Sequence, residues 1–168
     1  LASKNAIVIP SSGRVFAQLI DSPSLFQKKR LGTVSGFDLS AFNVFHAIYH
    51  NYDVMELHGL QSQFTQLTDI QQVFEFSFSG VLTKPHEERL VKFDVLNEGT
   101  YHHPAIVFWI ELDLDEEASI DCSPYSEHKT CHWSQAVQYL DVESLFVQKS
   151  ITLRAHHDEG KIWFSLAE

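Results

Sequence analysis

Apolar and polar residues alternate along several stretches of the chain, and a period of two predicts β-strands. The clearest alternations lie at 73–82 and 91–95, where apolar side chains share one face. The longest strand signal is 106–114, and 14–21 is largely apolar on both faces, which indicates a strand covered on both sides. Shorter strands are predicted at 54–57, 133–140, 150–155 and 161–166, with a turn at 157–160 joining the last two.

One segment shows helical rather than strand spacing. Five apolar residues are spaced by three or four positions, as on one face of a helix: Leu39, Phe42, Phe45, Ile48 and Tyr49. Asp38 and Ser40 stand at its start, and their side-chain oxygens can accept from the unpaired amides of a first helical turn. The pattern predicts a short helix over 41–50.

The segment 22–35 has no period. It contains Pro23, Gly32 and the basic cluster Lys28-Lys29-Arg30, which is too small for a nucleic-acid stripe. We therefore interpret 22–35 as a loop or a projecting arm.

Composition supports a mainly β fold. The chain has 168 residues with 13 Phe, 5 Tyr and 3 Trp, and aromatic residues suit pleated, half-buried surfaces. The length suits one domain. We expect residues 1–168 to form a single antiparallel β-barrel or sandwich with one short helix and a projecting arm.

Charge and cysteine content narrow the classes of partner. The net charge of −10 repels phosphate backbones, so we expect no nucleic-acid binding; the acidity either attracts a cationic peptide or only maintains solubility. No apolar run reaches the length of a spanning helix, so we expect no membrane partner. The 2 cysteines, Cys122 and Cys131, are expected to be reduced in an intracellular protein. A start at Leu1 without a leader indicates an excised or processed piece.

The pentapeptide Cys131-His132-Trp133-Ser134-Gln135 is the most distinctive motif. It follows the strand 106–114, a Ser123-Pro124 turn and a polar loop at 125–130. A His at a strand start can orient a carboxylate, and a Trp face can stack on a guanidinium. Taken alone, the motif favours the structural interpretation, with Trp133 in the core and His132 at a strand end.

The order of these features resembles the C-terminal barrel of the protein arginine methyltransferases. In that family a strand, a Ser-Pro turn and a Thr-His-Trp loop followed by Lys-Gln form one wall of the arginine pocket. Ile7-Val8-Ile9-Pro10 matches the lead-in to that barrel, and Gly36-Phe37-Asp38-Leu39-Ser40 matches the close of its dimerisation arm. The chain is most similar to the second, degenerate module of a two-module member, because Cys131 and Ser134 replace the family's Thr and Lys.

The resemblance implies a parent that transfers a methyl group from S-adenosylmethionine to protein arginine. The glycine-rich cofactor loop and the two substrate-gripping glutamates are missing here, so the cofactor site lies outside this chain and the chain alone is expected to be inactive. His132 and Trp133 are the implied substrate-pocket loop. Arm or dimer-type contacts are implied for Leu25, Phe26, Leu31 and Phe37.

The implied partners are arginine-containing protein substrates and the missing N-terminal half or a paired module. The cytoplasm is the expected compartment, with the nucleus as a second one.

A non-catalytic barrel that binds a protein partner, stabilised by zinc or not, is the alternative. His128 and Cys131 have the short spacing of a zinc pair, and Cys122 with His102 or His103 supplies further ligands. Nucleophilic catalysis is less favoured, because the neighbours Cys131 and His132 point to opposite faces in a strand.

Overall fold

The computed structural model describes residues 6–45, 52–78, 84–126, 133–140, 145–158 and 160–167. Its centre is a pair of long antiparallel strands, β1 (Ser12–Asp21) and β9 (Pro104–Asp113), in register from Ser12 opposite Asp113 to Asp21 opposite Pro104. Both strands are largely buried, as the apolar runs predict.

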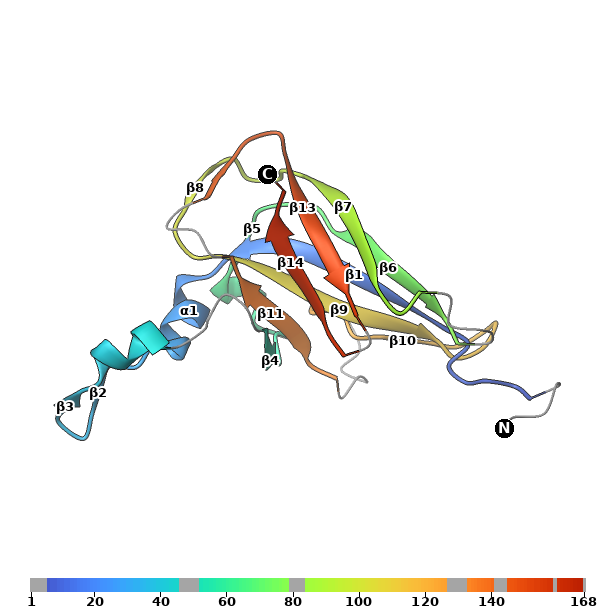
Figure 1. Cartoon of the computed structure of the whole chain (residues 1–168), viewed down its shortest axis with the longest axis horizontal. Coiled ribbons are helices and arrows are strands. Elements are labelled where there is room, and N and C mark those ends of the chain that lie inside the picture. The colour runs from blue at the N-terminus through green and yellow to red at the C-terminus, as the bar shows by residue number, and fades with distance from the viewer. Residues whose placement is uncertain are drawn as a thin grey trace.

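Two sheets enclose the main core (Figure 1). The larger is built on β1 and β9 and adds β4 (Asp53–Met55), β5 (Thr65–Gln66), β6 (Gln71–Ser77), β10 (Ser119–Asp121) and β11 (Gln135–Tyr139). The smaller has the order β14-β13-β7, with β7 (Glu87–Asp94), β13 (Ser150–His157) and β14 (Ile162–Leu166). Two small strand pairs complete the described strands: β8 (Gly99–Tyr101) with β12 (Leu145–Val147), which is distant in the sequence, and the hairpin of β2 (Thr33–Val34) with β3 (Phe37–Asp38). Every strand pairing in the described residues is antiparallel.

The sheets form an open barrel whose edges meet at two seams. At the β6–β7 seam, Arg89 Nη1 donates to Val73 O at 2.8 Å, and Thr68 forms an isolated bridge with Val95. At the β11–β14 seam, the buried side chain of Gln138 bonds both backbone groups of Phe164: Nε2 donates to its carbonyl (2.7 Å) and Oε1 accepts from its amide (2.9 Å). The predicted mainly β barrel or sandwich is confirmed.

A second core lies on the outer face of the larger sheet. Side chains of β9 and β11 there pack against a helix and against the segment 57–64; the members include Val107, Trp109, Val137, Tyr139, Leu25, Phe26, Leu57 and Phe64. The larger sheet is therefore covered on both faces, which explains why β9 is apolar on both faces from Pro104 to Ile110.

The α-helix found among the described residues occupies a different segment from the predicted one. It is α1 (Pro23–Lys29), with the Ser22 side chain accepting from Leu25 N, and Pro23 in the first turn. The helix predicted over 41–50 is confirmed for its described part, but as the 3₁₀ helix η1 (Ser40–Phe45) and not as an α-helix; residues 46–50 lie outside the described ranges. Asp38 still caps it, accepting from Ser40 N at 2.9 Å.

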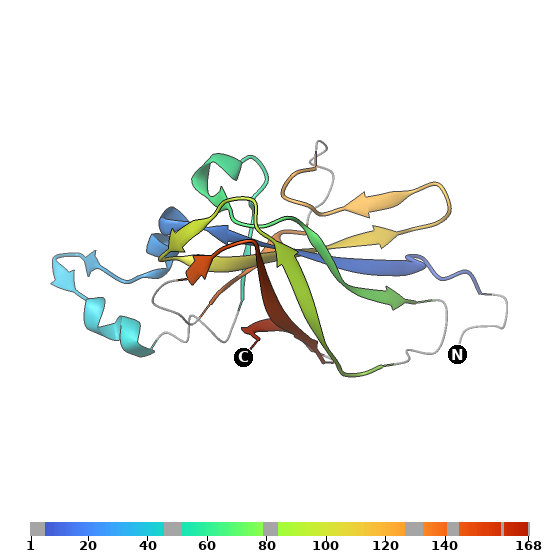
Figure 2. The same cartoon turned by 90° about the horizontal axis from the view of Figure 1, so that it is seen from above.

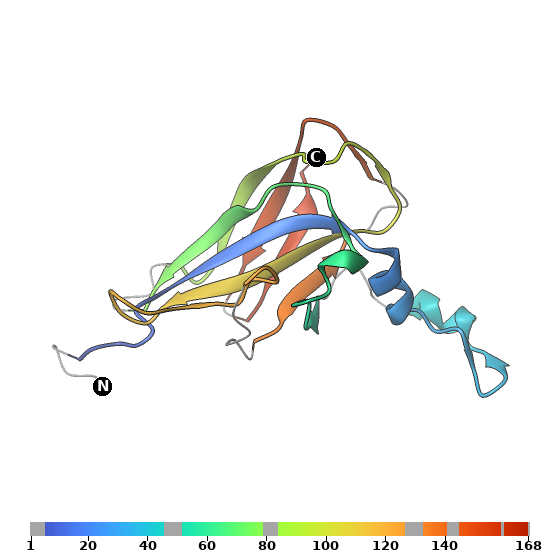
Figure 3. The ribbon, with the colours of Figure 1, turned by 180° about the vertical axis from the view of Figure 1, so that it is seen from behind.

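Beyond α1 the chain projects from the body as the arm, defined here as residues 31–43 (Figures 1 and 2). Its tip is the β2–β3 turn, where Ser35 and Gly36 have φ of 52° and 85°. Seen from behind, the arm extends from the end of the barrel opposite the start of β1 (Figure 3). The arm interpretation thus holds for the second part of 22–35, while the first part is helix.

The described residues include no helix long and apolar enough to cross a membrane.

Candidate functional site

Trp133 lies immediately before β11 and is 53 % exposed. It is therefore not a core residue, and the interpretation that placed it in the core is wrong. Its role as a wall of a substrate pocket stays a prediction. His132, the other half of the predicted loop, lies outside the described residues.

The zinc alternative gains no support. Cys122 is buried and disulfide-bonded, so the expectation of a reduced thiol is wrong for this residue and its sulfur is not a free metal ligand. His128 and Cys131 lie outside the described residues, and within the described ranges no group of three or more His, Cys, Asp and Glu is arranged to hold a metal. His103, a further candidate ligand, instead stacks on Phe26 with ring centroids 4.4 Å apart.

The segment 122–126, here named the stem, leads toward Trp133 and is held by side-chain donors. Three alternate carbonyls of the stem each have such a partner. Gln135 Nε2 donates to Cys122 O at 2.8 Å, and Gln61 Nε2 donates to Pro124 O. His58 Nε2 lies 2.5 Å from Ser126 O, where the ring nitrogen acts as donor. The stem is thus fastened to the segment 57–61 and to β11.

Gln135 makes a second contact with its other amide atom. Its Oε1 accepts from Leu57 N at 2.8 Å, so a side chain that is 3 % exposed has both polar atoms satisfied. The sequence motif contains this residue, but the sequence argument used it only as a marker of spacing. A polar residue at a strand start beside apolar neighbours is the one signal that could have identified it.

Tyr125 anchors the middle of the stem onto the sheet. Its ring meets Trp109 edge-on at 6.2 Å, and its hydroxyl donates to Gln18 Oε1. Gln18 is itself buried and donates to Thr68 O at 2.6 Å. Burial raises the pKa of the Tyr125 hydroxyl, so this group remains a neutral donor at physiological pH.

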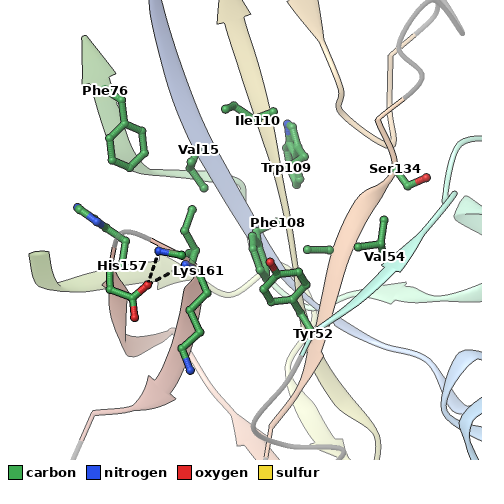
Figure 4. A pocket seen from close by; sticks show the side chains of 14 residues that line it. Val15, Tyr52, Val54, Phe76, Phe108, Trp109, Ile110, Ser134, His157 and Lys161 are labelled. Carbon is green, nitrogen blue, oxygen red and sulfur yellow. Dashed lines mark hydrogen bonds between the residues drawn. The ribbon is translucent and has the colours of Figure 1, made fainter. Parts of the chain in front are cut away.

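A pocket of about 400 Å³ opens on the inner side of the larger sheet, next to the start of β11 (Figure 4). Its walls come from β1, β4, β6, β9, β11 and the β13–β14 turn; the lining residues are Val15, Tyr52, Val54, Phe76, Phe108, Trp109, Ile110, Ser134, Ala136, His157, Asp158, Gly160, Lys161 and Ile162. Ser134 adjoins Trp133 in the sequence, so the pocket begins beside the predicted loop.

The pocket surface is mostly aromatic and aliphatic. Tyr52 meets Phe108 edge-on at 5.3 Å, and Phe76 meets His157 edge-on at 5.1 Å. At the rim, Asp158 Oδ1 accepts from Gly160 N and Lys161 N, and these backbone hydrogen bonds lower the pKa of the Asp158 carboxyl. Asp158 is thereby committed to the turn, and the surface is suited to binding an apolar or planar group rather than to proton transfer.

The predicted arm contacts divide into two kinds. Leu25 and Phe26 are 0 % and 7 % exposed and pack in the second core, where Phe26 also meets Tyr139 edge-on at 5.3 Å. They are held inside the domain because α1 lies on the sheet. Leu31 and Phe37 are 41 % and 72 % exposed and remain available on the arm.

A group of carboxylates lies at the far end of β9. Glu111 and Asp121 are opposite each other on β9 and β10, and Arg14 Nη2 lies 3.7 Å from Glu111 and 2.9 Å from Asp113. Desolvation, followed by the charge of Asp121, raises the pKa of the Glu111 carboxyl despite the Arg14 guanidinium. The acids beyond it, 115–117, form the β9–β10 turn, where Asp115 Oδ1 accepts from Glu117 N and Ala118 N.

No protein-family profile matches the chain. Among curated proteins, it is 26 % identical over 205 residues to protein arginine N-methyltransferase 7 of Drosophila melanogaster, covering 100 % of this chain and 29 % of that protein. It is 25 % identical over 185 residues to the protein of the same name from Cricetulus longicaudatus, covering 99 % and 26 %. The chain thus spans less than a third of the length of these relatives.

A solved structure with the same fold is the Trypanosoma brucei PRMT1 enzyme–prozyme heterotetrameric complex with AdoHcy. The TM-score is 0.66 at 12 % identity, over 92 % of this chain and 49 % of that one. This chain resembles the barrel domain of the protein arginine N-methyltransferases. The family resemblance seen in the sequence is confirmed, and the name of the curated relatives agrees with the expected likeness to two-module members such as arginine methyltransferase 9 or 7.

Proposed function

We propose that this chain is the C-terminal barrel of an S-adenosylmethionine-dependent protein arginine N-methyltransferase, which transfers a methyl group to the guanidinium of a protein arginine. The observation that carries the proposal is similarity to arginine methyltransferases along the whole chain, together with their barrel fold. The position of Trp133 adds support, since it stands exposed immediately before β11.

The barrel's share of the work is to form one wall of the substrate groove. A planar guanidinium binds well on the face of an indole through stacking and cation–π attraction. Trp133 is exposed enough to offer such a face, and its backbone is fixed by β11. His132 is proposed to orient an acidic group of the missing half.

This chain by itself does not fit the cofactor. A nucleotide site of the common open-sheet type uses parallel strands and a helix N-terminus after a glycine-rich turn. The described strands pair only antiparallel, and α1 has 7 residues with its N-terminus capped by Ser22. We therefore assign S-adenosylmethionine to the other half of the parent, and expect the chain alone to be inactive.

The partners proposed are an arginine-containing protein substrate and the missing half or a paired module. The arm offers exposed apolar side chains for module pairing: Leu31, Val34, Phe37 and Phe42. If this is the degenerate second module, its main contribution is to support the first. The proposed compartment is the cytoplasm, with the nucleus as a second one.

Calorimetry with S-adenosylmethionine tests the proposal, using this chain and its natural N-terminally extended form side by side. We expect binding in the extended form only, followed by methylation of an arginine-rich peptide. Absence of binding and of methylation in both forms would reject a live methyltransferase and favour a non-catalytic, protein-binding barrel. Methylation by this chain alone would overturn the assignment of the cofactor to the other half.

A further inference from the structure

The loop between Cys122 and Gln135 is closed at its base by a side chain. Gln135 follows Trp133 by two residues and reaches back to the carbonyl of Cys122, where the same loop begins. Its Oε1 also accepts from Leu57 N, so one buried amide joins the two ends of the loop and the neighbouring segment 57–61.

His58 and Gln61 extend this attachment along the stem. The carbonyls of Cys122, Pro124 and Ser126 are spaced by two residues, and each accepts from a different side chain: Gln135, Gln61 and His58. In a sheet, alternate carbonyls of a strand face one neighbour and receive its amides. Here side-chain donors take the place of that neighbouring strand, so the stem has a defined path without belonging to the sheet.

We propose that Gln135, Gln61 and His58, named here the clamp, are positioning residues that fix where the loop presents Trp133. Its catalytic consequence rests on the proposed function, because Trp133 must first be part of the substrate groove. Its structural consequence does not: the clamp holds the stem and Gln135, two residues after Trp133, whether or not the parent methylates arginine.

Gln138 provides a matched control on the same strand. It is as buried as Gln135, at 3 % exposure for each, and it too bonds one backbone carbonyl and one backbone amide. Both of these bonds go to Phe164 on β14. Replacing either glutamine with methionine removes the same kind of contacts at similar side-chain volume, but only one replacement touches the clamp.

The test compares Gln135→Met with Gln138→Met in the full chain. Hydrogen exchange of the Leu57 amide reports the clamp directly, since that amide donates to Gln135. Loss of one buried hydrogen bond should speed this exchange by about tenfold in Gln135→Met. The fluorine spectrum of 5-fluorotryptophan-labelled chain follows the 3 Trp residues, with the Trp133 resonance assigned from Trp133→Phe.

We expect Gln135→Met to move the Trp133 resonance and to leave that of Trp163, which adjoins Phe164. Gln138→Met should do the reverse. Equal responses of Trp133 to the two variants, or no response to Gln135→Met, would overturn the proposal and leave Gln135 as a stability residue. If Gln135→Met does not fold, Gln61→Met at the partly exposed Pro124 contact answers the same question, with the same two outcomes.

In the extended parent, Gln135→Met should raise the KM for an arginine peptide severalfold and leave the KM for S-adenosylmethionine unchanged. A displaced Trp133 resonance with unchanged peptide kinetics would confirm the clamp and reject Trp133 as a groove wall. Gln135→Glu sharpens the result, since it keeps the acceptor for Leu57 N but loses the donor to Cys122 O. It should keep Leu57 protected while still moving Trp133; unchanged Trp133 would contradict the role of the Cys122 contact.

Discussion

The arm and the stem both leave the body of the barrel, but they are held in opposite ways. The stem is fastened along its length by the clamp and by Tyr125, and its polar groups are satisfied inside the domain. The arm is anchored at its root, where Phe26 and Leu25 are buried and Lys29 pairs with Asp53 of β4. Beyond the root its apolar side chains are exposed.

This contrast separates two uses of a loop. A segment whose contacts are all internal keeps one geometry and can place a side chain accurately. A segment that has a fixed root and exposed apolar side chains can bury those side chains against another protein surface. Substitutions at the root, in the arm and in the loop should therefore have different effects: on stability, on association and on peptide turnover, respectively.

The largest effect is expected at the root. Phe26→Ala should lower the free energy of unfolding by about 3–5 kcal/mol, because it removes a large aromatic side chain from a packed core. Phe26 is 7 % exposed and contacts His103, Tyr139 and Arg30. Urea denaturation measures the change. A loss below about 1 kcal/mol would mean that α1 is not part of the core. Deleting residues 22–30 would therefore not be a clean test of the arm, because the deletion removes the core residues Leu25 and Phe26.

On the arm, Phe37→Ser should leave the free energy of unfolding within about 0.5 kcal/mol of that of the unsubstituted chain, because the side chain is 72 % exposed. Association of the extended form should instead weaken by about tenfold or more, as expected for an exposed aromatic anchor at an interface. Sedimentation of the extended form measures it. Leu90→Ser, exposed on β7, is the control. If both variants associate as strongly as the unsubstituted extended form, the arm is not part of the interface.

At the loop, Trp133→Ala should cost less than about 1 kcal/mol of stability, since more than half of the residue is exposed. In the extended form the same change should lower kcat/KM for an arginine peptide. Thermal melts and peptide methylation measure the two effects. A stability loss as large as that of Phe26→Ala would show that Trp133 is a core residue and contradict its exposed position.

The smallest effect concerns Glu111. Its pKa is raised in the folded state, so the folded protein holds this proton more tightly than the unfolded chain does. Stability therefore falls as the pH rises from the unfolded pKa through the folded one, and the penalty persists at neutral pH. Glu111→Gln should raise the Tm slightly at pH 7 and have no effect well below the ordinary glutamate pKa of about 4.3. Glu116→Gln, in the exposed β9–β10 turn, is the control and should leave the Tm unchanged at both pH values. A stabilisation that grows toward acid pH would contradict the assigned direction.

The fold was predictable where strands are long. At β1, β6, β7 and β9 a period of two repeats often enough to be recognised, and the pattern locates each strand to within a few residues. Strands of two or three residues, such as β5 and β8, show no period and were missed. α1 was also missed because its 7 residues display only one apolar pair, although Ser22 followed by Pro23 is a recognised helix start.

The candidate site was predictable only in part. The sequence singles out the loop that contains Trp133, but it does not show what holds the loop. The clamp contacts join residues 63, 68 and 78 positions apart, and no local spacing reports such distances. Leu25 and Phe26 were assigned to the arm because sequence order placed them next to it, and their burial depends on β9 and β11, which come much later in the chain.

Gln138 gives the barrel an unusual freedom in its construction. In a barrel closed all round by backbone pairing, strand number and stagger together set the diameter, so a shift in one strand must be matched by the others. Here, among the described residues, the side-chain amide of Gln138 spans the gap between β11 and β14. Strands in either sheet can lengthen, shorten or slide during evolution as long as that amide still meets Phe164. A seam joined by a side chain is thus a way for barrels with short closing strands to diverge while their cores stay intact.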